Sequence, residues 1–284
     1  MRLATFNLLH GVPVLGASLE GRPDPTGGRG ALPLVLDDGL LRESVAQLDA
    51  DVLGLQEVDV AQPRSGGVHQ VRSCALALDA SHWRFAPSVA GTPGEGRWRE
   101  ADDADERAGN DADDVEPLYG VGLVSRLPVL EWRSTRLDAA PWTLPLVVPA
   151  QPRPRVVRVP DEPRAAIAAV IDGPNGVLTV ATAHLSFVPG YNVRQLRALV
   201  RWLADLPRPL VLLGDFNLPG GLPRRITGWT SLVQRPTYPS PRPRVQFDHV
   251  LADGVSADVV ARARDQVHAL PVSDHTAVTV DVDL

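Results

Sequence analysis

Short runs of apolar, β-rich residues recur along the chain, and each is bounded by Gly, Pro or Asp. Runs of this length with such boundaries are typical of buried β-strands. The predicted strands lie within residues 3–9, 51–58, 121–129, 165–171, 178–186, 210–217, 247–252 and 276–284. The pattern therefore indicates a protein rich in strands, with helices in some of the intervals.

Three of those intervals carry a helical pattern. The segment 192–206 places its apolar residues at helical spacing, and Asn192 is the expected N-cap. Segments 37–50 and 68–80 form two further amphipathic patterns. The proline-dense stretch 145–164 predicts a loop or an edge hairpin. With no internal repeat and no clear linker, we predict one domain over residues 1–284.

Composition bounds the class of protein. The chain has 284 residues, 44% of them hydrophobic, which is enough for a substantial core. Its single cysteine, Cys74, excludes an intramolecular disulfide and fits a reducing compartment. No apolar stretch reaches the roughly 18 residues of a membrane span, and the N-terminus lacks the apolar region of a secretory signal. We expect a cytoplasmic monomer without stable membrane insertion.

The charge of the chain is unevenly spread. The formal net charge is −6, yet residues 100–116 alone hold nine acidic residues and one arginine, so the remainder is close to neutral. This composition predicts a solvated, mobile acidic loop over about 95–117. The chain contains no lysine, which excludes Schiff-base and phosphate-loop lysine chemistry.

Polar side chains occupy the ends of several predicted strands. The apolar run 210–213 leads into Asp215 and Asn217, which share one face at the carboxyl end of the strand. Open α/β sheets bind their ligands at this edge, although strand-end turn chemistry also explains the pair. The other polar residues at or beside strand ends are Asn7, Glu57, His184, Asp248, Asp274 and His275. Each has a structural explanation alone; their recurrence indicates a common site.

These residue types suit a hard cation and a phosphate. Oxygen ligands such as Glu57 fit Mg²⁺ or Mn²⁺. Asn7 and Asn217 can orient a phosphate or a water without adding charge. A histidine held by an aspartate is a general base near neutral pH. Because no thiolate or three-histidine pattern is present, a zinc site is disfavoured.

The ordered motifs "TFN", "LQEVD", "GVGLVSRLP", "TAHLS", "LLGDFN", "FDHVL" and "SDH" resemble the endonuclease/exonuclease/phosphatase superfamily, whose members include DNase I-like nucleases, neutral sphingomyelinases and inositol-phosphate phosphatases. The resemblance runs from Asn7 to His275. It implies an α/β (α+β) fold, a four-layer α/β/β/α sandwich of two mixed β-sheets flanked by helices. It also implies that the site lies where strands of both sheets converge at one edge.

The resemblance assigns expected roles to the polar residues. Glu57 matches the ligand of the divalent metal, Mg²⁺ or Mn²⁺, with Asn7 and Asp274 close by.

On the catalytic side, Asp215 and Asn217 match the pair that positions the attacking water and the phosphoryl group. His275 matches the base or phosphate-contacting histidine, oriented by Asp248. His184 matches the second histidine of the nuclease and sphingomyelinase branches, which stabilises charge on the phosphoryl group. Which of Asp215 and His275 takes the proton of the water stays open.

The predicted activity is metal-dependent hydrolysis of a phosphodiester or phosphomonoester. The substrate stays open among nucleic acid, a lipid headgroup and a small phosphorylated metabolite, so a nuclease and a sphingomyelinase-like phosphodiesterase are both alternatives. A catalytically silent binding protein of the same fold is a third. Arg224 and Arg225 are candidate substrate-binding residues, although a solvated Pro/Arg loop explains them equally well.

Overall fold

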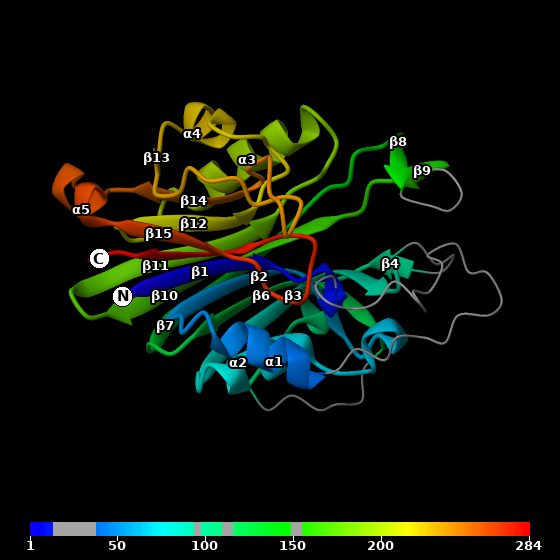
Figure 1. Ribbon diagram of the computed structural model, residues 1–284, viewed down its shortest axis with the longest axis horizontal. Coiled ribbons are helices and arrows are strands. Elements are labelled where there is room, and N and C mark those ends of the chain that lie inside the picture. The colour runs from blue at the N-terminus through cyan, green and yellow to red at the C-terminus, as the bar shows by residue number, and fades with distance from the viewer. Residues whose placement is uncertain (14–37, 94–97, 110–115, 149–154) are drawn as a thin grey trace.

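The computed structural model describes residues 1–13, 38–93, 98–109, 116–148 and 155–284. Within these residues, the strands form two large sheets that lie face to face and a separate two-stranded sheet (Figure 1). Both large sheets are mixed, since each contains parallel and antiparallel pairs. The architecture is an α/β sandwich of two mixed sheets between layers of helices, as predicted.

The first sheet consists of β1 (Arg2–Asn7), β2 (Val52–Val60), β3 (His82–Gly91), β4 (Trp98–Glu100), β5 (Arg107–Ala108), β6 (Leu118–Ser125), β15 (Arg264–His268) and β16 (Ala277–Asp281). The order is β15-β16-β1-β2-β6-β3-β4, and β5 also pairs with β3. The N-terminal strand β1 is therefore an interior strand of the sheet, between β2 and the C-terminal strand β16.

The second sheet consists of β7 (Val129–Leu137), β10 (Arg164–Gly173), β11 (Gly176–His184), β12 (Leu210–Asp215), β13 (Thr230–Ser231) and β14 (Asp248–Asp253), in the order β13-β14-β12-β11-β10-β7. Strands β8 (Thr143–Val148) and β9 (Arg155–Pro160) form the separate antiparallel hairpin, in the region where the proline-dense stretch allows one. The single strand predicted over 121–129 is wrong. The chain turns there, so that β6 ends at Ser125 and β7 begins at Val129 in the other sheet.

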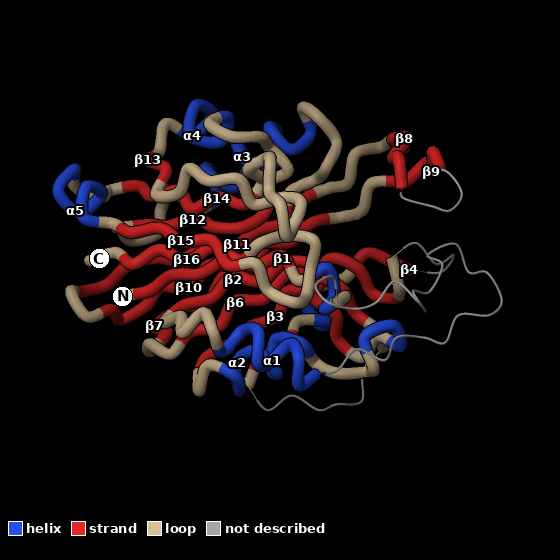
Figure 2. The backbone as a smooth tube through the Cα atoms, in the orientation of Figure 1, coloured by secondary structure: helices blue, strands red, loops and turns tan. Residues whose placement is uncertain are grey.

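The described helices are α1 (Asp38–Ala46), α2 (Gln70–Ala77), α3 (Tyr191–Trp202), α4 (Leu222–Thr227) and α5 (Ala257–Arg262), with short 3₁₀ turns η1 (Leu9–Gly11), η2 (Pro63–Ser65) and η3 (Asp103–Asp105). Helices α1 and α2 cover the outer face of the first sheet, and α3 and α4 cover that of the second (Figure 2). None of the described helices is long and apolar enough to cross a membrane.

The predicted helices are present, with one correction at α3. Its N-cap is Gly190 and not Asn192. The Asn192 side chain accepts a hydrogen bond from the backbone N–H of Gly190 (3.1 Å) and donates one to the carbonyl oxygen of Asn217 (2.9 Å). Asn192 therefore ties the start of α3 to the loop after β12. Cys74 is buried in α2, in agreement with its predicted place in the core.

Alternation along the strands decides which side chains enter the space between the sheets. In β12, Val211 and Leu213 belong to the core between the sheets, whereas Leu210 and Leu212 pack with the helices outside. Asp215 has the same parity as Val211 and Leu213, so it faces the first sheet. The sheets approach closely here, because a Cβ atom added to Gly54 would lie 2.1 Å from Cδ1 of Leu213.

The described part of the acidic segment differs from the solvated loop expected over 95–117. Strands β4 and β5 pair with β3, and Asp105 is 7% exposed. Both its carboxylate oxygens accept from Arg99, at 2.7 and 2.9 Å. Arg136 on β7 pairs with Asp103. Arg99 thus accompanies the one aspartate that is buried in the described part of this segment, whereas Asp103 stays exposed beside Arg136. Residues 95–97 and 110–115 lie outside the described residues.

Candidate active site

Three residues from neighbouring strands of the second sheet stand side by side. His184 ends β11 and pairs with Asp215 at the end of β12, and Asp215 pairs with Asp248 at the start of β14. Because register partners on adjacent strands project from the same face, all three side chains face the first sheet. We call His184, Asp215 and Asp248 the cross-strand row.

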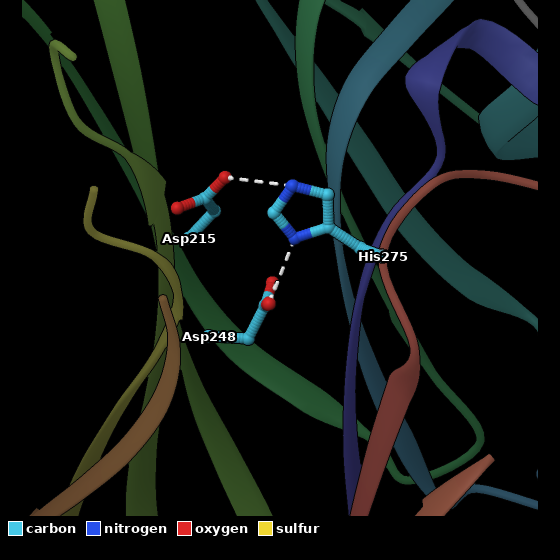
Figure 3. A group of neighbouring side chains, drawn as sticks. All are labelled: Asp215, Asp248 and His275. Carbon is cyan, nitrogen blue, oxygen red and sulfur yellow. Dashed lines mark hydrogen bonds and ion pairs between the residues drawn. The ribbon is translucent and has the colours of Figure 1, made fainter. Parts of the chain in front are cut away.

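His275, from the loop that precedes β16, is placed between two carboxylates of this row (Figure 3). Its Nδ1 lies 2.8 Å from Oδ2 of Asp248, and its Nε2 lies 3.7 Å from Oδ2 of Asp215. Asp248 is fully buried, and His275 is 7% exposed. Burial lowers the pKa of His275, but the carboxylates of Asp248, Asp215 and Asp274 outweigh it and raise that pKa to about 10. In the metal-free protein, His275 is therefore a buried cation.

Glu57 reaches the site because β2 is irregular at this point. The pairing of β2 with β6 shifts between Leu55 and Val58, and Glu57 has a φ of 52°. A bulge of this kind redirects a side chain, and here it brings Glu57 to Asn7. The Asn7 amide nitrogen donates to Oε1 of Glu57 and to Oδ2 of Asp215, both at 3.0 Å. Asn7 thus joins carboxylates from both sheets.

The carboxylates of the site have raised pKa values. Burial raises the pKa of Glu57 to about 7; the hydrogen bond from Asn7 and the charge of His275 oppose this, while Asp274 and Asp215 add to it. Burial also raises the pKa of Asp215, to about 6, against the charge of His275. Burial raises the pKa of Asp274 in the same way. The ionised forms of these carboxylates are therefore poorly solvated in the metal-free protein.

Left-handed backbone conformations are found at three site positions, Glu57, Asn217 and Ser273, with φ of 52°, 49° and 72°. Such conformations cost on the order of 1–3 kcal/mol outside glycine and persist where the surrounding structure imposes them. At Asn217 the imposing contact is local, since its backbone N–H donates to Oδ1 of Asp215 (2.9 Å). At Glu57 and Asn217 this backbone brings the side chain to a site residue, whereas the hydroxyl of Ser273 accepts from the backbone N–H of His275 (3.0 Å).

His184 has different neighbours from His275. Its Nδ1 lies 3.2 Å from Nη1 of Arg164, and its Nε2 lies 3.3 Å from Nδ2 of Asn217 and 3.7 Å from Oδ2 of Asp215. Burial first, and then the charges of Arg164 and His275, lower the pKa of His184 well below its ordinary value. The two histidines of the site thus differ in charge, one neutral and one cationic.

A divalent cation fits the donor groups of this site. Burial is the largest cause of the raised pKa values of Glu57, Asp215 and Asp274, so their ionised forms are poorly solvated and a bound cation would stabilise them. Oδ1 of Asp248 is buried without a hydrogen-bond partner among the described residues. Ligand atoms of Asp215, Asp248 and His275 lie within 4.8 Å of one another. Oxygen donors of this kind suit Mg²⁺ or Mn²⁺.

The structure brings eight of the predicted site residues together at one end of the space between the sheets: Asn7, Glu57, His184, Asp215, Asn217, Asp248, Asp274 and His275. Arg224 and Arg225 instead lie exposed on α4, in the layer outside the second sheet, and their role stays a prediction. Sequence reasoning missed Arg164. The motif "DEPR" places two acids and an arginine directly before a buried strand, but it does not indicate that the arginine contacts His184.

Two mixed sheets between layers of helices define the fold class as DNase I-like. A family model for the Endonuclease/Exonuclease/phosphatase family matches residues 4–275, and the chain belongs to this family. Members of the family generally hydrolyse phosphoester bonds.

Solved structures share the fold at low sequence identity. An endonuclease/exonuclease/phosphatase from Beutenbergia cavernae is 19% identical with a TM-score of 0.59, covering 100% of this chain and 71% of that one. A mannosyl-6-phosphatase from Bacteroides thetaiotaomicron is 16% identical (TM-score 0.54, 100% of both chains). The human Nocturnin catalytic domain with bound sulfate is 14% identical (TM-score 0.52, 100% and 94%). A search of curated proteins gives no significant match.

Proposed function

We propose that this protein is a divalent-metal-dependent phosphoesterase that hydrolyses a phosphodiester or phosphomonoester by in-line attack of an activated water. The observation that carries the proposal is the position of His275, which faces Asp248 at 2.8 Å and Asp215 at 3.7 Å inside the site of a family of phosphoester hydrolases. A buried acid–histidine–acid arrangement supplies both a proton acceptor and a cation for a phosphoryl group.

Glu57, Asn7 and Asp274 are the proposed residues of the Mg²⁺ or Mn²⁺ site. His275, hydrogen-bonded through Nδ1 to Oδ2 of Asp248, is cationic in the metal-free protein and would repel an ion placed beside it. We therefore place the ion beside Glu57, whose ionised form is poorly solvated because the carboxyl group is buried. A bound divalent ion supplies Lewis-acid stabilisation of charge on the phosphoryl and leaving oxygens.

The remaining residues act on the water and the phosphoryl group. Asp215 and His275 face each other. While His275 is cationic, the carboxylate of Asp215 is the group that can take the proton of the water, and His275 takes that role only in its neutral form. The Asn217 amide and His184 supply N–H groups beside Asp215, where a phosphoryl oxygen accepts them. Asp248 holds the imidazole of His275 in a fixed orientation. These donors stabilise the charge that develops in the transition state.

Hydrolysis of bis-p-nitrophenyl phosphate tests the reaction class. We expect turnover in Mg²⁺ or Mn²⁺ that is abolished by EDTA and by His275→Ala. His82→Ala is the matched control, because His82 begins β3 on the first sheet and is no part of the site. Turnover that persists in EDTA contradicts the metal dependence. A folded protein that hydrolyses no phosphate ester would be the silent binding protein of the same fold.

The substrate is decided by a parallel panel of plasmid DNA, single-stranded DNA, sphingomyelin and inositol phosphates. A sugar 6-phosphate belongs in the panel because one structural neighbour is a mannosyl-6-phosphatase. An RNA substrate is added to cover the nuclease alternative. The substrate with the highest kcat/KM assigns the activity among nuclease, lipid phosphodiesterase and metabolite phosphatase.

A further inference from the structure

Arg164 contacts His184 at Nδ1, whereas Asn217 lies at Nε2 on the other side of the ring. Arg164 opens β10 and is 4% exposed, and its Nη1 lies 3.2 Å from Nδ1 of His184. Carboxylates fix the guanidinium in turn: Glu162 lies 3.2 Å from Nη1 and Asp161 lies 3.5 Å from Nη2. A buried arginine with this many partners is a rigid part of the site.

The guanidinium decides which nitrogen of His184 carries a proton. Arginine has only N–H donors and stays charged at every relevant pH, so the Nδ1 atom of His184 that faces it must be the acceptor. A neutral imidazole that accepts at Nδ1 carries its proton on Nε2. Each neutral tautomer places an N–H group against a donor, either Nη1 of Arg164 at 3.2 Å or Nδ2 of Asn217 at 3.3 Å. The guanidinium carries a full charge and the amide does not, so the tautomer that accepts from Arg164 is the more favourable one.

The neighbour at the other nitrogen is also a donor. Nδ2 of Asn217 donates to the carbonyl oxygen of Leu185 at 2.9 Å, which sets the orientation of the amide. Nε2 of His184 and Nδ2 of Asn217 are 3.3 Å apart, and two donors cannot bond to each other. Both N–H groups are therefore available to one acceptor beside Asp215, which suits an anionic phosphoryl oxygen.

We infer that Arg164 is a positioning residue that holds His184 in the Nε2–H tautomer, so that His184 serves the phosphoryl group as a neutral hydrogen-bond donor and not as a general acid. The kinetic consequence rests on the proposed function, whereas the tautomer itself does not. The two histidines then have separate tasks: His275 lies between carboxylates, and His184 lies between an arginine and an amide.

The tautomer is measured directly by two-bond ¹H–¹⁵N correlation spectra of metal-free protein labelled in histidine, with His184 assigned by its loss in His184→Ala. We expect the proton on Nε2 in the wild type and in Arg164→Lys, which keeps a cationic donor. A wild-type spectrum with the proton on Nδ1, or on both nitrogens, overturns the inference whatever the enzyme hydrolyses. An Nε2–H signal in a protein that hydrolyses nothing counts against the proposed function alone.

A double-mutant cycle separates positioning from a general loss of structure. His184→Ala should lower kcat by about 10²–10³, as for other donors aimed at developing charge. Arg164→Met should lower kcat by at least about tenfold with little change in KM, and Arg164→Lys should recover part of that loss. Because Arg164 acts through His184, adding Arg164→Met to His184→Ala should cost nothing further. Losses that multiply in the double variant overturn the inference; if Arg164→Met fails to fold, Arg164→Lys completes the cycle.

Discussion

His249 offers a sharp test of how burial sets the pH dependence of stability. It follows Asp248 in β14 but points to the opposite face, where its ring stacks on Phe216 with centroids 5.4 Å apart. Its Nε2 lies 2.8 Å from the carbonyl oxygen of Leu218. Burial lowers the pKa of His249 from 6.5 to about 4, although Leu218 and Asp248 favour the charged ring. The folded protein therefore keeps this histidine neutral where the unfolded chain protonates it.

The sign and size of the pH effect on the free energy of unfolding follow from this difference in the pKa of His249. Between pH 6.5 and 4 the unfolded chain binds more protons than the folded protein, so the free energy of unfolding falls on acidification. Above pH 6.5 His249 contributes no pH dependence, and below about pH 4 the loss is complete. Each pKa unit is worth about 1.4 kcal/mol, so the loss attributable to His249 is about 3 kcal/mol.

The comparison protein is His249→Gln, whose amide can donate to Leu218 and stays neutral at every pH. Urea unfolding of both proteins in EDTA, from pH 4 to 8, gives the free energy of unfolding as a function of pH. Above pH 6.5 the difference in free energy of unfolding between the two proteins should be constant. Between pH 6.5 and about 4 the wild type should lose about 3 kcal/mol more than the variant. Parallel curves over the whole range would refute the reasoning. Because His249 faces away from the site, turnover at pH 7.5 should stay within a few-fold of wild type.

Three further predictions concern the site and the contact between the sheets. Asn217→Ala should lower turnover by about 10²–10³ with an unchanged circular dichroism spectrum, and wild-type turnover would contradict the assigned role. Mg²⁺ at about 100-fold its Kd should stabilise the protein by about 2.7 kcal/mol in thermal unfolding, and loss of this shift in Glu57→Gln is the expected result. Gly54→Ala should cost roughly 1–3 kcal/mol in urea unfolding because its Cβ atom meets Leu213, whereas Gly221→Ala, with open space around it, should cost only a few tenths.

Most of the residues that meet at the site can be predicted from the sequence, because strand alternation and the order of the motifs are visible in it. Asp215 and Asn217 are two residues apart at the end of an apolar run, so a shared face is predictable without coordinates. Glu57 is different. Its parity in β2 would place it on the helix-covered face, and only the bulge and the φ of 52° turn it toward Asn7. The alternation of apolar and polar residues in the sequence does not predict that bend.

Contacts between residues far apart in the sequence account for most of the other differences between the prediction and the structure. The acidic segment looks solvated when its charges are counted locally, but its described part pairs with Arg99 and with Arg136, which lies about 30 residues further along the chain. Arg164 likewise precedes His184 by 20 residues, and nothing in a single sequence marks their contact. The turn at 126–128 was missed because apolar residues continue on both sides of it.

Under the proposed function, the cross-strand row makes catalytic activity a reporter of strand pairing. His184, Asp215 and Asp248 meet only when three strands are aligned to the residue, since a slip of β12 by one position would turn Asp215 toward the helices. A compact state with native secondary structure but shifted register would keep its far-ultraviolet spectrum and lose all turnover. During refolding, the return of activity would therefore report when β11, β12 and β14 reach their final register, separately from the recovery of secondary structure.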